Sequence, residues 1–410
     1  MTSSRRTLLH YLGQHKLRLA LGIVIVALSA FVAVLAPLLI GRIVDALTAG
    51  ADLDIVTTLA LIMVALAAAE NVLRGLGRWR ILDASRQIEY RMRNDLLGHL
   101  QTMHLGYFQH QRIGDLMARL TNDLQAVRQM IGFGTLMMTN TLLTLLFTFI
   151  SMFSVNAKLA AIALILTPIS SYTFWTIGRR VNRRFELLQA QFGDLSAKAQ
   201  ENFSGIRVVK AFSQEEQEIA SFAVVNRDYL DRAVDLAKVN GLVWPAMQFL
   251  LGGAVLAILY IGGQDAIDRQ LTIGQLVQFV AYLQLISWPM IALGEVTNMV
   301  QQGWASLGRL QTLYEAEAAV ADPRDPVTTP ITGAVEFRNV AFAYGTAIVL
   351  RDISFTVPAG GSLAIVGPTG SGKSSLVNLI PRLFDAQQGE ILIDGVDVTR
   401  YPVPALRRAI

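Results

Sequence analysis

Six long apolar stretches constrain the fold of this chain more strongly than any other feature of its sequence. A helix needs about 20 predominantly apolar residues to cross the hydrocarbon core of a bilayer. The stretches lie at Leu19–Ile40, Ile55–Gly77, Ile131–Val155, Leu159–Gly178, Leu242–Ile261 and Ile273–Leu293. A hydrophobic fraction of 53% and a charged fraction of 16% are typical of a membrane protein. The sequence therefore predicts an α-helical membrane domain with six transmembrane helices.

The first stretch has one alternative interpretation, a secretory signal peptide, because Arg5, Arg6, Lys16 and Arg18 precede it. Its apolar run is longer than the core of a signal peptide. The run also ends in a Pro-Leu-Leu-Ile sequence at residues 37–40 rather than at a small-residue cleavage site. These features favour a transmembrane helix.

Basic residues gather in the two long loops, residues 78–128 and 179–238, whereas the short loops near residues 45–54, 156–158 and 264–269 hold few. Loops rich in Lys and Arg stay on the cytoplasmic side of a membrane. We therefore expect a multi-pass protein of the cell (inner) membrane, with the N-terminus, both long loops and everything after the sixth span in the cytoplasm.

The two long loops have helical periodicity. In the second loop, apolar residues recur at steps of three and four from Phe185 to Ile206. We expect long helices joined by turns near Gln109–Gly114 and Phe212–Glu216, with tips that contact a cytoplasmic domain. Helical hairpins that pack only on each other are the alternative.

A phosphate-binding motif lies near the C-terminal end, with the pattern G-x-x-x-x-G-K-[ST]. Ser362–Val366 is interpreted as a buried strand before it, and apolar residues from Leu376 to Leu383 predict a helix after it. Glycines let the backbone N–H groups and the start of that helix face a phosphate. Lys373 is expected to neutralise the terminal phosphates of ATP as the catalytic lysine, and the Ser374 hydroxyl to bind Mg²⁺. The predicted nucleotide-binding residues are Gly367, Pro368, Thr369, Gly370, Ser371, Gly372, Lys373, Ser374 and Ser375. A glycine-rich turn without a ligand is the alternative.

The domain organisation follows from composition. Residues 1–310 are assigned to the membrane domain, 311–332 to a linker that contains the proline-rich Ala321–Pro326, and 333–410 to an incomplete α/β P-loop NTPase domain. Short strands are predicted at Ala334–Val340, Ile353–Val357 and Glu390–Ile393, the last closed by an Asp-Gly turn. The chain has no cysteine and five scattered histidines, so no structural metal is expected. Its net charge of +4 is small, and we expect no nucleic-acid partner.

Several stretches, in order and correctly spaced, resemble a half-transporter of the ATP-binding-cassette exporter superfamily, B-type, a family of multidrug and lipid exporters. The matching stretches are Gly41–Asp45, Gly114–Asp123, Glu201–Phe212, Val335–Tyr344 and the phosphate loop. The resemblance implies six spans followed by one ATP-binding cassette, and a second half-transporter as partner, with which the chain forms a homodimer or heterodimer. It also implies that Tyr344 stacks on adenine, although a plain core tyrosine is the alternative.

The same resemblance implies that the turns of the two long loops are coupling helices, the second of them seated on the partner subunit. In this family the glutamine loop, signature sequence, magnesium-binding aspartate, general-base glutamate and switch histidine follow later than Ile410. We expect these 410 residues alone to hydrolyse ATP at no useful rate.

Polar groups inside spans are candidates for substrate contact because the bilayer makes them costly. The candidates are Glu295, at the cytoplasmic end of the sixth span, and Trp288 within it. The alternative for Glu295 is helix–helix packing, and for Trp288 an interfacial aromatic residue. Glu70 and Arg74 lie four residues apart and are expected to pair along their helix, while Trp244 is interpreted as an interfacial aromatic residue.

The leading functional hypothesis is an ATP-driven exporter of drugs, lipids or other amphipaths. One alternative is a nucleotide-binding membrane subunit that regulates a complete partner without hydrolysis. A P-loop kinase with a membrane anchor is the other alternative, but it needs only one or two spans.

Overall fold

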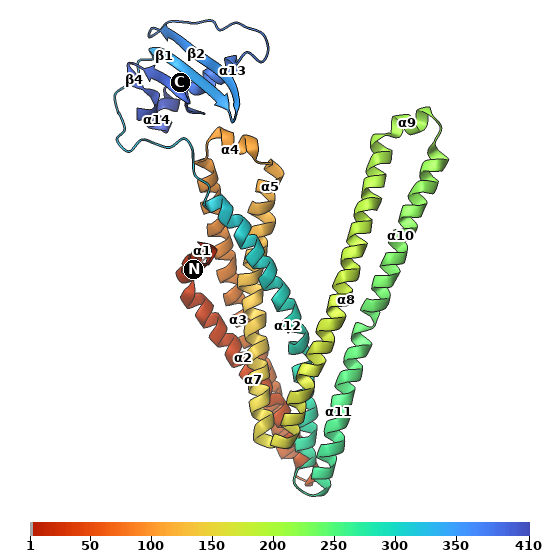
Figure 1. Cartoon of the computed structure of the whole chain (residues 1–410). Coiled ribbons are helices and arrows are strands. Elements are labelled where there is room, and N and C mark those ends of the chain that lie inside the picture. The colour runs from red at the N-terminus through yellow and green to blue at the C-terminus, as the bar shows by residue number, and fades with distance from the viewer. Residues whose placement is uncertain (1–2) are drawn as a thin grey trace. The chain divides into compact units, whose positions relative to one another are not determined.

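The computed structural model describes residues 3–410, except for the side chains at positions 166, 167, 170, 171, 174, 175, 290, 291 and 293. Figure 1 shows a long helical part followed by a small sheet domain, as the sequence predicts. The helical part consists of α1 (Ser3–Gln14), α2 (Lys16–Thr48), α3 (Leu53–Gln101), α4 (Leu105–His110), α5 (Ile113–Ala118), η1 (Arg119–Asp123), α6 (Leu124–Gln129), η2 (Met130–Gly134), α7 (Thr135–Val155), α8 (Ala157–Ser204), α9 (Ile206–Ala211), α10 (Glu215–Gly241), α11 (Val243–Ile267) and α12 (Ile273–Tyr314).

Among the described residues, five helical stretches are long and apolar enough to cross a membrane. They are Lys16–Thr48, Leu53–Gln101, Ile113–Val155, Glu215–Ile267 and Ile273–Tyr314. Each contains one of the predicted spans. The remaining predicted span, Leu159–Gly178, lies in α8, where several side chains fall outside the described set. The helix α12 continues beyond the predicted sixth span as far as Tyr314.

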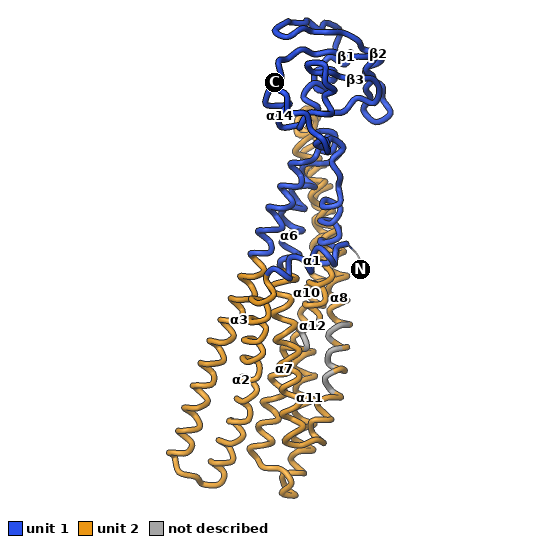
Figure 2. Tube along the Cα trace, turned by 90° about the vertical axis from the view of Figure 1, so that its left-hand side faces the viewer, with its two compact units in different colours: residues 1–14, 87–128, 303–410 blue, residues 15–86, 129–302 orange. Residues whose placement is uncertain are grey.

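The chain divides into two compact units, which Figure 2 colours separately. Unit 1 contains residues 1–14, 87–128 and 303–410, and unit 2 contains residues 15–86 and 129–302. Two long helices, α3 and α12, therefore contribute to both units.

The core of unit 2 is formed by apolar side chains of α2, α7, α8, α11 and α12. Phe279 and Tyr282 of α12 are fully buried in it, and the Tyr282 hydroxyl donates to the Val34 carbonyl oxygen at 3.4 Å. At one end of this unit, Gly274 lies so close to the Gly41 carbonyl that an added Cβ would come within 2.1 Å of its oxygen. Small residues at such positions let membrane helices approach closely.

The second long loop is a helical hairpin, called here the second hairpin: α8 and α10 run side by side and the short helix α9 connects them (Figure 1). The predicted turn is confirmed, because residues 212–214 separate α9 from α10. Ion pairs join the two long helices, among them the exposed pair of Arg184 with Asp235 at 3.3 Å and the partly exposed pair of Lys198 with Glu218 at 2.8 Å. Exposed pairs of this kind contribute little stability.

The first long loop forms the first hairpin, which runs from α3 through α4 to α6. Its predicted turn is also confirmed, at residues 111 and 112 between α4 and α5. Within unit 1, the buried Asp123 carboxylate accepts two hydrogen bonds from Arg309 of α12, one of them from Nε at 3.0 Å. The Tyr11 hydroxyl of α1 donates to Asp95 of α3 at 2.6 Å. Polar bonds thus tie this hairpin to the neighbouring helices.

The small domain is built on a four-stranded antiparallel sheet in the order β2-β1-β3-β4. Its elements are β1 (Val335–Tyr344), β2 (Ala347–Val357), α13 (Lys373–Leu379), β3 (Gln388–Ile393), β4 (Val396–Asp397), η3 (Val398–Arg400) and α14 (Val403–Arg408). The core contains Phe337 and Ile391 of the sheet and Leu379 of α13. The strands predicted near β1, β2 and β3 are confirmed, and so is the Asp-Gly turn, in which Asp394 and Gly395 have positive φ angles.

One predicted strand is wrong. Ser362–Val366 has no strand assignment, and Val366 is 90% exposed. The four described strands pair only with one another, so this apolar segment has no ladder partner. A buried strand needs neighbours on both sides, which the apolar run by itself does not supply. The helix after the loop is also shorter than its apolar pattern, because Pro381 follows its end at Leu379 and has no N–H to donate.

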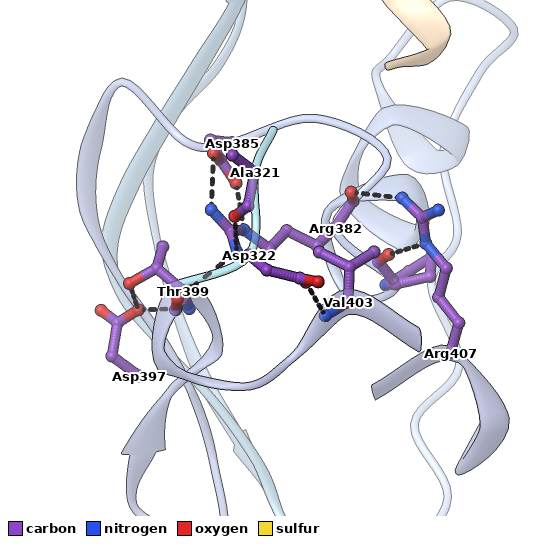
Figure 3. Close-up of polar contacts among 9 residues, drawn as sticks. Ala321, Asp322, Arg382, Asp385, Asp397, Thr399, Val403 and Arg407 are labelled. Atoms are coloured by element: carbon purple, nitrogen blue, oxygen red, sulfur yellow. Dashed lines mark hydrogen bonds and ion pairs between the residues drawn. The ribbon is translucent and has the colours of Figure 1, made fainter. Parts of the chain in front are cut away.

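The predicted linker, residues 311–332, begins with the end of α12 at Tyr314; its residues 316–332 form no helix or strand and are held to the small domain by polar contacts (Figure 3). The buried Arg382 guanidinium pairs with both oxygens of Asp385 and donates to the carbonyl oxygens of Ala321, at 3.1 Å, and Thr399, at 3.3 Å. The Asp322 carboxylate accepts a bond of 2.7 Å from the Val403 N–H at the start of α14. The linker therefore enters the small domain at a fixed place.

Candidate functional site: the phosphate loop

The phosphate loop lies between β2 and α13, and glycines set its path. Gly370 and Gly372 have φ angles of +87° and +89°, a region that side chains rarely adopt. At Gly372 an added Cβ would also come within 2.8 Å of the Leu350 side chain. At Gly367 an added Cβ would come within 2.8 Å of the Ser371 hydroxyl oxygen. The loop thus keeps a concave face that other residues would fill.

Lys373, the first residue of α13, folds back over the loop. Its ammonium group donates to the carbonyl oxygens of Gly367 at 2.7 Å and Pro368 at 2.8 Å, and lies 3.4 Å from the Ser371 hydroxyl oxygen. The positive charge is therefore held at the mouth of the loop by neutral acceptors. An anion in the loop would meet this charge directly.

The two serines that follow Lys373 differ in burial. Ser374, the predicted magnesium ligand, is exposed, whereas Ser375 is 7% exposed. The Ser375 hydroxyl lies 3.2 Å from the Tyr344 hydroxyl, a contact that the sequence does not predict. Thr369, Gly370 and Ser371 are exposed on the loop itself.

Tyr344 ends β1 and is half-buried beside the core of the small domain. Its ring makes edge contacts with Phe342 at 4.8 Å and with Phe384 at 5.2 Å. It also lines a cavity of about 450 Å³ with residues of α4, among them Tyr107 and His110. The structure thus places Tyr344 next to the phosphate loop, and its stacking on adenine stays a prediction.

These residues fit a magnesium–nucleoside triphosphate. The loop offers a concave face kept free by Gly367, a cation at its mouth and an exposed hydroxyl at Ser374. Hydroxyl and phosphate oxygens are the ligands that Mg²⁺ prefers. Among the described residues, no group of three or more His, Asp or Glu residues could hold a metal by itself.

Comparison with known proteins decides the family. The model of the ABC transporter transmembrane region matches residues 19–290, and that of the ABC transporter domain matches residues 350–410. The chain belongs to the ABC transporter family. This membership agrees with the apolar helices of the structure: the protein is a multi-pass membrane protein with an ATP-binding domain.

The names of relatives of this ABC transporter chain describe different transport activities. A probable multidrug resistance ABC transporter ATP-binding/permease protein of Bacillus subtilis is 33% identical over 95% of this chain and 68% of its own length. An ATP-dependent lipid A-core flippase of Syntrophus aciditrophicus is 34% identical over 78% of this chain and 53% of the flippase. A fatty acid ABC transporter ATP-binding/permease protein of Mycobacterium bovis is 32% identical over 78% of this chain and 51% of that protein. The chain thus spans about half to two thirds of the length of these relatives.

The candidate substrate residues lie far from the loop in sequence, on the part of α12 that belongs to unit 2. Trp288 is 61% exposed, and Glu295 is exposed as well. The side chain of Ile291, on the same helical face as Glu295, falls outside the described set. Their role in substrate binding stays a prediction. Glu70 and Arg74 form the predicted ion pair along α3.

Sequence analysis did not single out Arg382, Phe384 or the contact between Tyr344 and Ser375. A local signal exists for Arg382, because a basic and an acidic residue three apart, here Arg382 and Asp385, favour an ion pair. The other contacts join residues 31 or more positions apart, such as Tyr344 and Ser375, and leave no local pattern.

Proposed function

We propose that the chain is part of an ATP-driven exporter that moves drugs, lipids or other amphipathic compounds out across the cell membrane. One observation carries the proposal: a phosphate loop with a lysine at its mouth follows an ABC transporter transmembrane region with long apolar helices in one chain. The assigned domains are residues 1–310 for the membrane part, 311–332 for the linker and 333–410 for the nucleotide-binding part. The basic residues of the two long loops favour a cytoplasmic location for the nucleotide-binding part, where ATP is.

Different residues of the chain would contact the phosphates, the magnesium ion and the base of the nucleotide. Residues 367–372 would surround the phosphates with backbone N–H groups, Lys373 would neutralise their charge, and Ser374 would hold Mg²⁺. Tyr344 would offer its ring to the base. ATP, when bound and hydrolysed, supplies the free energy for transport.

A second half-transporter completes the proposed assembly. In the second hairpin, Phe203, Val208 and Phe212 are 77%, 61% and 71% exposed, and α9 has no buried residue among its described positions. Exposed apolar patches on a protein surface mark interaction sites. We propose that α9 docks on the nucleotide-binding domain of the partner subunit, whether an identical chain or a different one.

The proposal is tested by measuring ATP hydrolysis by the protein encoded by the complete gene, in lipid vesicles, with candidate cargos of three kinds: cationic drugs, fatty acids and lipids. We expect at least one class to stimulate hydrolysis, and Lys373→Ala to abolish the stimulated rate. A rate that no class changes, or that Lys373→Ala leaves intact, contradicts the proposal. If the Glu295 carboxylate binds cationic cargo, Glu295→Gln weakens transport of cations more than of neutral compounds.

A further inference from the structure

The contact between Tyr344 and Ser375 joins the end of β1 to the first turn of α13. The two hydroxyl oxygens lie 3.2 Å apart, and Ser375 is buried where it meets the ring. Ser375 follows Lys373 and Ser374 directly in the chain. Since neighbouring residues on a helix point about 100° apart, a bond that holds Ser375 toward the core directs the two preceding side chains away from it.

The Tyr344 ring is itself held in place. Phe342, which is 3% exposed, contacts it edge-on from β1, and Phe384, which is 9% exposed, does so from the segment after α13. Phe384 in turn packs against Gly106 of α4, where an added Cβ would lie 3.3 Å from its ring. These ring contacts therefore fix the position of the Tyr344 hydroxyl in the small domain.

We propose that Tyr344 is a positioning residue for the phosphate loop: its hydroxyl fixes Ser375, and through it the start of α13, so that Lys373 and Ser374 face the phosphates. This inference rests on the proposed nucleotide binding and extends it. A tyrosine that acts only by stacking on the base needs no hydroxyl. A tyrosine that positions the loop needs its hydroxyl even when the ligand has no base.

Inorganic tripolyphosphate with Mg²⁺ separates these two roles, because it offers phosphates without a base. We would measure its competition with a fluorescent ATP analogue for the 410-residue chain in lipid nanodiscs. Tyr344→Phe and Ser375→Ala remove the same bond from opposite sides. Each should weaken tripolyphosphate binding about three- to ten-fold, the range expected for one hydrogen bond, and the double variant should be no weaker than the single ones.

A matched control distinguishes positioning from general destabilisation. The Tyr401 hydroxyl donates to the Ile393 carbonyl oxygen at 3.1 Å in the same core, away from the loop. Tyr401→Phe should lower the melting temperature as Tyr344→Phe does, yet leave tripolyphosphate binding unchanged. Ser375→Thr, which keeps a hydroxyl, should recover most of the affinity that Ser375→Ala loses.

The outcomes are distinct. Unchanged or tighter tripolyphosphate binding in Tyr344→Phe and Ser375→Ala overturns the positioning role while leaving nucleotide binding intact. Additive losses in the double variant also overturn it. If one variant does not fold, the other decides. A wild-type chain that binds neither the ATP analogue nor tripolyphosphate overturns the proposed function as well.

Discussion

The two long helical hairpins have similar architecture but different surroundings at their tips. In the first hairpin, α4 lies against the small domain: Gly106 packs on Phe384, and the His104 ring accepts a bond of 3.2 Å from the Ala319 N–H of the linker. In the second hairpin, α9 carries exposed Val208 and is followed by exposed Phe212. The difference indicates that the tip of the first hairpin packs against its own chain. The exposed apolar side chains at the tip of the second hairpin are consistent with the proposed docking on a partner subunit.

The largest effect is expected at the second tip. Phe212→Asp should weaken association of two nucleotide-loaded copies at least about ten-fold, because apolar anchors at interface centres often carry about 2 kcal/mol or more. It should leave the melting temperature of the single chain nearly unchanged, since the side chain is 71% exposed. The measurement is the dimer fraction in nanodiscs as a function of protein concentration. Val224→Asp, at a 64% exposed position of α10 away from the tip, is the control. Equal association for wild type and Phe212→Asp refutes docking at α9.

The next effect concerns the polar bonds that anchor the first hairpin. Asp123→Asn leaves the buried end of the bond to Arg309 without its charge. Hydrogen bonds to charged groups contribute about 1.5–3 kcal/mol, and we expect a loss of about 2 kcal/mol in thermal or urea unfolding. Arg184→Gln removes an exposed pair of the second hairpin, the one with Asp235, and should change the melting temperature by about 1 °C or less. Similar losses in both variants would mean that the two hairpins are anchored alike.

A substitution at Gly106 tests the contact of α4 with the small domain. Gly106→Val brings extra atoms against Phe384 and the His104 ring, which lies 3.1 Å from an added Cβ. Overpacking of this kind typically costs about 1–3 kcal/mol, so we expect about 1 kcal/mol of destabilisation and faster proteolysis of the linker. Gly114→Val, in α5 where an added Cβ meets nothing within 4 Å, is the matched control. Linker cleavage at the same rate in both variants would show that α4 does not rest on the small domain.

The smallest effect is a pH dependence in the small domain. The Asp394 carboxylate accepts bonds from Thr332 and from the backbone N–H groups of Gly333 and Ala334, and these bonds lower its pKa from 3.8 to about 2. A lowered pKa stabilises the folded domain above pH 3.8, and this contribution is lost as the pH falls toward about 2. Asp394→Asn should therefore lower the melting temperature by about 2 °C at pH 7.

The difference in melting temperature between wild type and Asp394→Asn should become smaller as the pH falls from 4 to 2, because the wild-type carboxylate becomes protonated. Melting curves recorded across that range measure it. A difference that stays constant with pH would show that the bonds to Thr332 do not depend on the charge of Asp394.

Much of the helical architecture was predictable because its signals are local. Apolar runs give the spans, and the periodicity from Phe185 to Ile206 gives the second hairpin. The prediction of a strand at Ser362–Val366 from its apolar run was wrong, because a strand depends on partners distant in sequence. The same holds for Arg382, whose bond to the Ala321 carbonyl spans 61 positions.

The candidate site also combines features that a local sequence pattern predicts with contacts that no local pattern predicts. The motif from Gly367 to Ser374 locates the loop in the sequence, and two of its glycines, Gly370 and Gly372, adopt the positive φ angles that favour glycine. The contacts that hold this loop, from Ser375 to Tyr344 and from there to Phe384 and α4, depend on packing between separate elements. Only a structure reveals them.

The central claim is that residues 367–375 of this chain bind a magnesium–nucleoside triphosphate. Equilibrium dialysis of the chain in nanodiscs against radiolabelled ATP tests it directly, with and without Mg²⁺. We predict saturable binding that requires Mg²⁺ and is weakened at least about ten-fold in Lys373→Ala, a loss typical of removing a buried or ligand-paired charge. The absence of saturable binding, or equal binding by wild type and Lys373→Ala, would contradict the account.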